Sequence, residues 1–193
     1  MTWNIPGFPS DLLTDDIEGV RRLAVDQQQT SFEKNFQFVF FDRFVNIAAT
    51  EQLVYKVTVG RNSVLFNRSN ELWSGWRELL VYQDVGVTFT GSLATVGNIK
   101  SMNRIKNPIY QTLPIPEITF QRANGVGIFS ATSAPIAGAA IVTSSATAQK
   151  AAEYTASDIR VGWPSGTVLW YVYNPIVTNE AANGHTEFIW GQR

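Results

Sequence analysis

The sequence predicts an all-β protein, an antiparallel β-sandwich or jelly roll with an extended or short-helical N-terminal arm. Apolar and polar residues alternate with a period of two along several segments after position 36. These segments are short, rich in β-branched and aromatic residues, and separated by Gly, Asn, Asp or Pro, as β-strands are. No helical period of useful length lies between them, which argues against parallel βαβ units and for antiparallel pairing.

The first 30 residues differ from the rest of the chain. Residues 1–30 are expected to form an arm, and residues 31–193 the sandwich domain. Apolar residues between positions 11 and 25 have spacings that fit one or two helical turns, while Gly19 prevents a long helix. A polar run, 26–30, then separates the arm from the domain.

About eight to ten strands are expected in the domain, a number that suits a sandwich or jelly roll. The candidate strands with the clearest alternation or β-branched content are 36–44, 53–59, 64–68, 76–82, 87–90, 118–122 and 140–144. The C-terminal third predicts a β-hairpin. There, a Pro-Ser-Gly turn at 164–166 leads into the aromatic strand 168–174, and a loop leads into the closing strand 185–193.

Composition excludes several classes of function. The 193 residues favour one domain, and a hydrophobic share of 45% supplies a core. A net charge of −1 leaves no basic footprint for nucleic acid. The absence of cysteine excludes disulfides, thiolate metal sites and cysteine nucleophiles.

Neither a secretory signal nor a membrane span is expected. The first residues lack the basic and apolar regions of a signal peptide, and the most apolar run, 135–142, is far shorter than the roughly 20 residues of a membrane helix. We therefore expect a soluble protein with neither a membrane nor a nucleic acid as its partner.

Short patterns follow one another in a recognisable order along residues 20–193. They occupy 21–26, 29–33, 64–69, 76–82, 88–91, 116–120, 163–167 and 188–190. This order resembles that of small virion-associated proteins of tailed bacteriophages. Such proteins usually carry a glycine-rich strand pair after the Val-Tyr element, whereas this chain has Gln-Asp-Val-Gly at 83–86.

The resemblance implies a β-sandwich component of the virion, either a capsid decoration or a part of the tail or fibre. It implies capsid or tail subunits as partners and assembly in the host cytoplasm, and it implies no catalytic residues. A homo-oligomer is expected, with a trimer favoured by analogy.

No catalytic, cofactor-binding or metal-binding residue is assigned. His185 is the only histidine, so a zinc site would need carboxylates for its other ligands, and we expect His185 to be a polar residue on a strand surface. No G-x-S-x-G or phosphate-binding glycine motif occurs. The acidic residues are scattered singly, which makes the carboxylate pair of a glycosidase the weakest interpretation.

Two groups of residues are candidates for binding. The first is the apolar set in the arm that is expected to dock on a partner subunit: Trp3, Ile5, Phe8, Leu12 and Leu13. The second consists of Trp73, Trp76 and Trp163, which could stack on sugar rings. The alternative for these three is that they close the ends of the core, and this alternative is favoured. Trp170 and Trp190 are expected in the core.

These observations lead to a principal hypothesis and an alternative. The principal one is a structural virion protein, a capsid decoration or head-associated protein held by its N-terminal arm. The alternative is a tail- or fibre-associated adhesin that binds host surface glycan.

Overall fold

The computed structural model describes residues 14–17, 20–23, 37–96, 98–102, 115–142, 152–155, 161–176 and 180–192. This described part contains sixteen strands and no helix, and every strand pair in it is antiparallel. The prediction of an all-β protein is confirmed. Within these residues, nothing has the helical length and apolar character that a membrane crossing requires.

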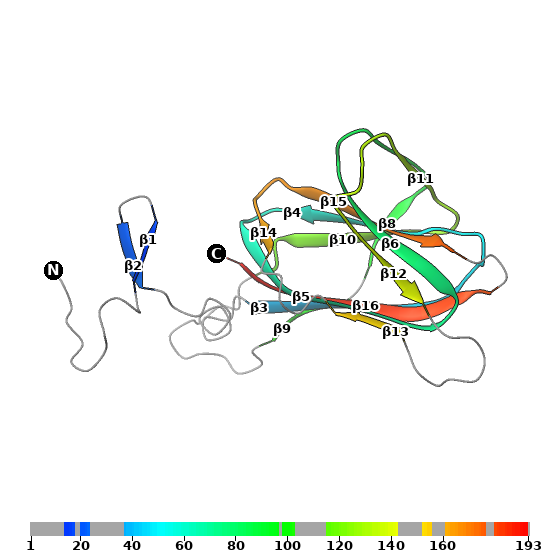
Figure 1. Cartoon of the computed structure of the whole chain (residues 1–193), viewed down its shortest axis with the longest axis horizontal. Helices are drawn as coiled ribbons and strands as arrows, with labels where there is room; N and C mark the ends of the chain where they lie inside the picture. The colour runs from blue at the N-terminus through cyan, green and yellow to red at the C-terminus, as the bar shows by residue number, and fades with distance from the viewer. Residues whose placement is uncertain are drawn as a thin grey trace.

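Two large sheets make up most of the fold (Figure 1). Sheet I has the order β12 (Ala137–Val142), β6 (Trp76–Gln83), β15 (Val168–Pro175), β4 (Leu53–Val59), β10 (Ile118–Ala123) and β8 (Leu93–Thr95). Sheet II has the order β13 (Ala152–Thr155), β5 (Ser63–Ser74), β16 (Ala182–Gln192), β3 (Gln37–Ile47) and β9 (Asn98–Ser101), and β14 (Val161–Trp163) also pairs with β5.

The main core lies between the two sheets. Phe40 of sheet II stacks on Phe120 of sheet I with ring centroids 3.9 Å apart, and Phe120 also contacts Trp190 at 5.6 Å. All three side chains are completely buried. Aromatic rings bury more area than any other side chains, so these contacts hold the layers together face to face.

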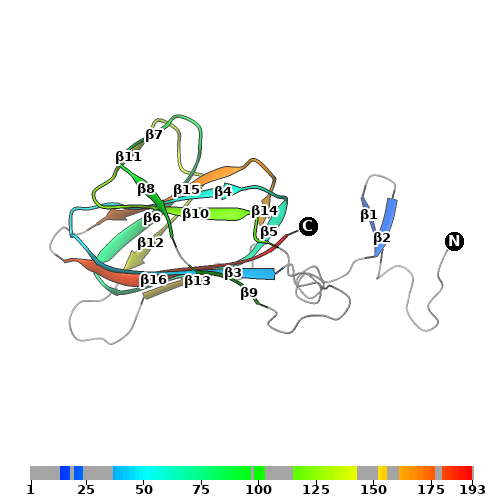
Figure 2. The same cartoon turned by 180° about the vertical axis from the view of Figure 1, so that it is seen from behind.

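A smaller core lies on the other side of sheet I. Two short strands, β7 (Val87–Thr90) and β11 (Ile128–Ala131), form a separate pair that covers this outer face (Figures 1 and 2). Phe129 of β11 and Phe89 of β7 each pack on Trp170, at 5.6 Å between ring centroids. The outer face of sheet II has no described strand layered over it in either view.

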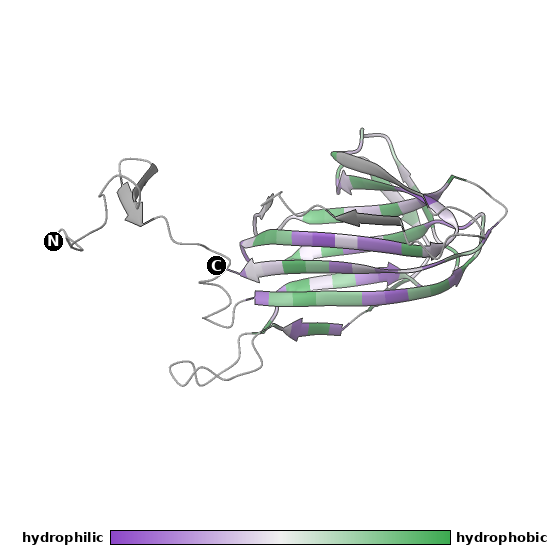
Figure 3. Ribbon diagram, turned by 60° about the horizontal axis from the view of Figure 1, so that its bottom comes forward, coloured by the Kyte–Doolittle hydropathy of each residue, from purple (hydrophilic) through white to green (hydrophobic). Residues whose placement is uncertain are grey.

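Alternation along the strands explains how both faces are built. In β16, Thr186, Phe188 and Trp190 are buried between the sheets, whereas His185 and Glu187 are only partly buried. Successive side chains of a strand point to opposite faces, so one strand supplies the core and the outer surface in turn. The same alternation appears as hydrophobic and hydrophilic bands in Figure 3.

The arm was expected to be extended or short-helical, and its described residues form strands rather than helical turns. Residues Thr14–Ile17 (β1) and Val20–Leu23 (β2) pair as a two-stranded antiparallel sheet of their own. Ile17 pairs with Val20, so only two residues connect the strands, which is the length of a tight hairpin turn. The apolar spacing that suggested helix is short enough to serve either structure.

The expected C-terminal hairpin is wrong. The strands β15 and β16 lie in different sheets, since β15 pairs with β4 and β6 while β16 pairs with β3 and β5. The Pro-Ser-Gly turn does form: the Thr167 N–H donates to the Pro164 carbonyl at 3.1 Å, and Gly166 has the positive φ of 84° that such a turn needs. Consecutive strands often pair, but here the chain changes layer between them.

Most strand predictions are confirmed in position. The segments 53–59 and 87–90 match β4 and β7 in both bounds, and the other candidates overlap longer strands. Five short strands of the domain were not predicted: β8, β9, β11, β13 and β14. Each has three or four residues, a length in which an alternating pattern repeats at most twice.

Replacing Phe120 with Ala should lower the free energy of unfolding by about 3–5 kcal/mol, because a cavity would open where four aromatic rings now meet. Denaturant titration of both proteins measures the change. Val126→Ala is the matched control, since Val126 is 68% exposed and its loss should cost under about 0.5 kcal/mol. Equal losses in the two variants would contradict the placement of this core.

Candidate functional site

Five side chains form an aromatic and charged cluster on the outer face of sheet II. We call it the outer-face patch, and its members are Phe41, Arg43, Glu71, Trp73 and His185. They come from β3, β5 and β16, three neighbouring strands of the sheet.

Strand register brings these residues together. His185 of β16 lies opposite Arg43 of β3 on one side and opposite Glu71 of β5 on the other. Phe41 and Trp73 lie two positions from Arg43 and Glu71 on the same face, so each is a diagonal neighbour of His185. The patch therefore exists only because β16 lies between β3 and β5.

The rings and charges of the patch are in direct contact. The ring of His185 lies 5.0 Å from that of Phe41 and 5.8 Å from that of Trp73, measured between centroids. The Arg43 guanidinium carbon lies 4.8 Å from the centre of the Trp73 ring, within the range of a cation–π interaction. The Trp73 indole N–H donates to Glu71 Oε1 at 2.7 Å, which fixes the orientation of the indole.

The patch is open to solvent. Phe41 is 39% exposed and Trp73 is 44% exposed, whereas most aromatic side chains of the sandwich are buried. Glu71 Oε2 lies 3.7 Å from His185 Nδ1, and this buried nitrogen makes no hydrogen bond within the described part of the chain. Among the ion pairs of that part, none involves Arg43. The patch thus offers aromatic faces beside a guanidinium that lacks a carboxylate partner there.

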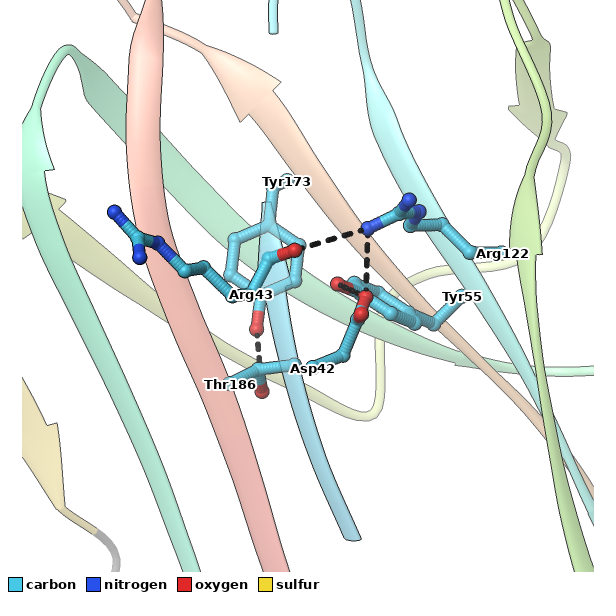
Figure 4. Close-up of polar contacts among 6 residues, drawn as sticks. All are labelled: Asp42, Arg43, Tyr55, Arg122, Tyr173 and Thr186. Atoms are coloured by element: carbon cyan, nitrogen blue, oxygen red, sulfur yellow. Dashed lines mark hydrogen bonds and ion pairs between the residues drawn. The ribbon is translucent and has the colours of Figure 1, made fainter. Parts of the chain in front are cut away.

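A second cluster of polar side chains lies between the sheets (Figure 4). The Asp42 carboxylate accepts hydrogen bonds from the Tyr55 hydroxyl and from Arg122, each at 2.7 Å. Nearby, the Tyr173 hydroxyl lies within hydrogen-bond distance of Asn70 and Thr186. Buried polar groups need such partners, and these bonds join strands of both sheets.

Burial sets the protonation of the interior tyrosines. Loss of hydration raises the pKa of Tyr55 well above its usual value, and the charge of Asp42 raises it further. Burial likewise raises the pKa of Tyr173, and that of Tyr171 to about 12. These hydroxyls therefore stay neutral at ordinary pH and serve as hydrogen-bonding groups inside the fold.

Several of the acidic residues, which are scattered singly along the sequence, have structural contacts. Asp84 accepts a hydrogen bond from the Trp170 indole at 2.7 Å, and Glu117 lies 3.5 Å from Arg61 in an exposed ion pair. Asp42 and Glu71 are held as described above. The described residues contain no group of three or more His, Asp or Glu side chains able to hold a metal ion.

Among the described residues, two hollows have linings that include core or strand-end side chains. One of about 500 Å³ is lined by residues that include Gln52, Phe129 and Pro175. The Gln52 amide is already occupied, since it accepts from the Phe129 N–H and donates to Asn174, both at 2.8 Å. The other, of about 290 Å³, lies beside Trp163. Of the described residues, Glu51 is the one acid that lines the first hollow, and no acid or histidine lines the second.

The three tryptophans proposed for glycan contact lie in three different environments. Trp73 is exposed in the outer-face patch. Trp76 is partly buried and lies on the outer face of sheet I. It belongs to sheet I, and Trp73 to sheet II, because the chain crosses between the sheets at Gly75, whose φ is 76°. Trp163 is only 3% exposed and packs 6.3 Å from Phe188. Trp163 therefore closes the core, as the favoured alternative held, and offers no surface to a sugar.

The remaining predicted residues are those of the arm and His185. Trp3, Ile5, Phe8, Leu12 and Leu13 lie outside the described residues. His185 is on a strand surface, as expected, but its contacts with Phe41, Trp73 and Glu71 were not foreseen. Phe41 follows the buried Phe40 and points to the opposite face, yet only the pairing of distant strands shows which surface residues share a face.

Comparison with known proteins adds no family: no protein-family model, no curated protein and no solved structure matches this chain.

The stability of the protein should fall as the pH rises from about 10 to about 12. In this range an unfolded Tyr171 loses its proton while the folded one retains it, so its contribution is complete below pH 10 and is lost on passing through about 12. Tyr171→Phe should make the decline shallower by about 1.4 kcal/mol per pH unit. Urea titrations at several pH values test this, and an unchanged slope would show that Tyr171 is not held neutral.

Proposed function

We propose that this chain is a structural component of a bacteriophage virion, a capsid decoration or head-associated protein that docks through its N-terminal arm. Its sandwich is a jelly roll. The order of sequence patterns along residues 20–193 supports the virion assignment by resemblance, and three features of the structure support it further.

The first supporting feature is the strand order. Sheet II contains the run β3-β16-β5-β13, and sheet I contains the run β4-β15-β6-β12. Along the chain these eight strands change sheet at every step except from β6 to β12, between which the pair β7–β11 is inserted. Two four-stranded sheets wound in this way are typical of jelly rolls, which occur in viral capsid and lectin domains. Fold alone does not fix function, so this is support by analogy.

The second feature carries the proposal: the buried polar chemistry serves to join strands. Asp42 links Tyr55 and Arg122 across the two sheets, and Thr186 donates to Asn70 at 2.6 Å within sheet II. The interior tyrosines are held neutral by burial. Such an interior suits a rigid, non-catalytic building block.

The third feature is the independence of the arm strands. Strands β1 and β2 pair with each other and with no strand of either large sheet. A segment that adds nothing to the pairing of the domain is free to act on a partner, and the partners proposed are capsid or tail subunits together with further copies of this chain.

Deleting residues 1–30 should leave a folded domain that no longer joins particles. The melting temperature should change little, because β1 and β2 pair only with each other. Full-length and truncated chains with a C-terminal tag can be followed on density gradients of purified phage particles and by gold labelling in negative stain. Continued incorporation of the truncated chain into particles would refute docking through the arm. Absence of the full-length chain from particles would refute the virion role.

A second candidate function, recognition of host glycan as a tail- or fibre-associated adhesin, is favoured by Trp73. Its indole is 44% exposed and is held in one orientation by Glu71. A rigid aromatic face at the surface is suited to stack on the apolar face of a sugar ring, since little conformational entropy is lost on binding.

Trp73→Ala should abolish binding on a glycan array if this second function holds. Because Trp73 is exposed, the variant should keep the melting temperature of the wild type within a few degrees. Ile128→Ala is the control, since Ile128 is 64% exposed on β11, over the outer face of sheet I, and should bind as the wild type does. An array on which the wild-type protein binds nothing would end this candidate.

A further inference from the structure

We infer that the outer-face patch binds an oligosaccharide that contains a carboxylated sugar, with the carboxylate at Arg43. This inference rests on the second candidate function, glycan recognition, and adds to it the site and the chemical class of the ligand.

The exposed aromatic area of the patch suits a small ligand. An aromatic side chain has roughly 150–250 Å² of surface, so the exposed 39% of Phe41 and 44% of Trp73 amount to roughly 120–200 Å². A stable protein interface buries about 800 Å² on each partner. A short oligosaccharide is matched to the smaller area.

The spacing of the rings suits a chain of sugars. Phe41, His185 and Trp73 follow one another diagonally across three strands, at 5.0 Å and 5.8 Å between centroids. These steps are comparable with the length of one pyranose unit. Consecutive sugars can therefore lie over consecutive rings, each placing its apolar C–H face on an aromatic surface.

The charges of the patch specify where an acidic group would lie. Glu71 is engaged by the Trp73 indole N–H at 2.7 Å, so its charge is partly satisfied within the patch. Arg43 makes a cation–π contact with Trp73 and, among the described residues, no ion pair. A guanidinium supported on an indole presents a planar set of donors that matches a carboxylate in a two-bond geometry.

The opposite end of the patch suits hydroxyl groups. Glu187 of β16 and exposed Asn98 of β9 flank Phe41 in the register of sheet II. A carboxylate and an amide accept hydrogen bonds from sugar hydroxyls, and Glu187 would repel an acidic group there. The ligand is therefore oriented, with its acidic sugar at Arg43 and neutral sugars toward Phe41.

The test compares pairs of ligands that differ only in the charge of the acidic group. Sialyllactose is paired with its methyl ester, and a galacturonic acid trimer with its fully methyl-esterified form, and each is titrated calorimetrically into the full-length protein. The acidic member of at least one pair should bind about tenfold tighter or more, as charge-assisted hydrogen bonds to a guanidinium do. Raising the salt concentration should weaken the acidic member and leave the neutral one almost unchanged.

Substitutions test whether Arg43 causes the preference for the acidic ligand. Arg43→Gln should reduce the affinity for the acidic member to that for the neutral member, while Trp73→Ala should remove binding of both. Lys100→Gln is the matched control, because Lys100 is an exposed cation on β9 of the same sheet, opposite Val39 and outside the patch, and its loss should leave the preference intact. Melting temperatures verify that every variant is folded.

The outcomes distinguish glycan recognition from the assignment of a carboxylate to Arg43. Equal affinity for acidic and neutral members, or a preference that survives Arg43→Gln, would overturn the carboxylate assignment and leave glycan recognition standing. Loss of the preference in Lys100→Gln would also overturn it, since the effect would then come from general charge. Failure of every acidic and neutral glycan to bind would overturn glycan recognition and this inference together.

Discussion

Strand β16 lies between β3 and β5, and this position organises both faces of sheet II. Its inward residues Phe188 and Trp190 fill the core between the sheets, and Thr186 forms hydrogen bonds with Asn70 and Tyr173. Its outward residue His185 joins the two halves of the outer-face patch. Core, polar network and patch are therefore consequences of one strand insertion, and a shift of its register by one residue would exchange the two faces.

The strand pairs within the two large sheets are nested along the sequence. Early strands pair with late ones: β3 with β16, β4 with β15, β5 with β13 and β6 with β12. The outermost pair joins residues near position 40 to residues near position 188. Such pairing brings together segments that are remote in sequence, and the entropy of closing these long loops is lost before the contacts form. Folding should accordingly be slow compared with that of proteins built from local hairpins.

The two outer faces of the sandwich differ in a way that bears on function. The face of sheet I is covered by β7 and β11, which bury Trp170 beneath Phe89 and Phe129. The face of sheet II keeps Phe41 and Trp73 at the surface. A building block with an inert interior, one covered face and one open aromatic face can be held by other subunits and still present a binding surface. The proposed virion role and the proposed glycan site are compatible for this reason.

Alternation and β-propensity are local properties of the chain, so they predicted the all-β class, most strand positions and the burial of Trp170 and Trp190. They did not predict which strands pair. The predicted C-terminal hairpin was wrong. In the arm, which was expected to be extended or short-helical, the described residues form the strand pair β1–β2, since a short apolar pattern fits more than one structure. The outer-face patch was decided only by the tertiary structure: His185 lies 142 positions from Arg43 and 114 from Glu71, and no local pattern carries the register that aligns them.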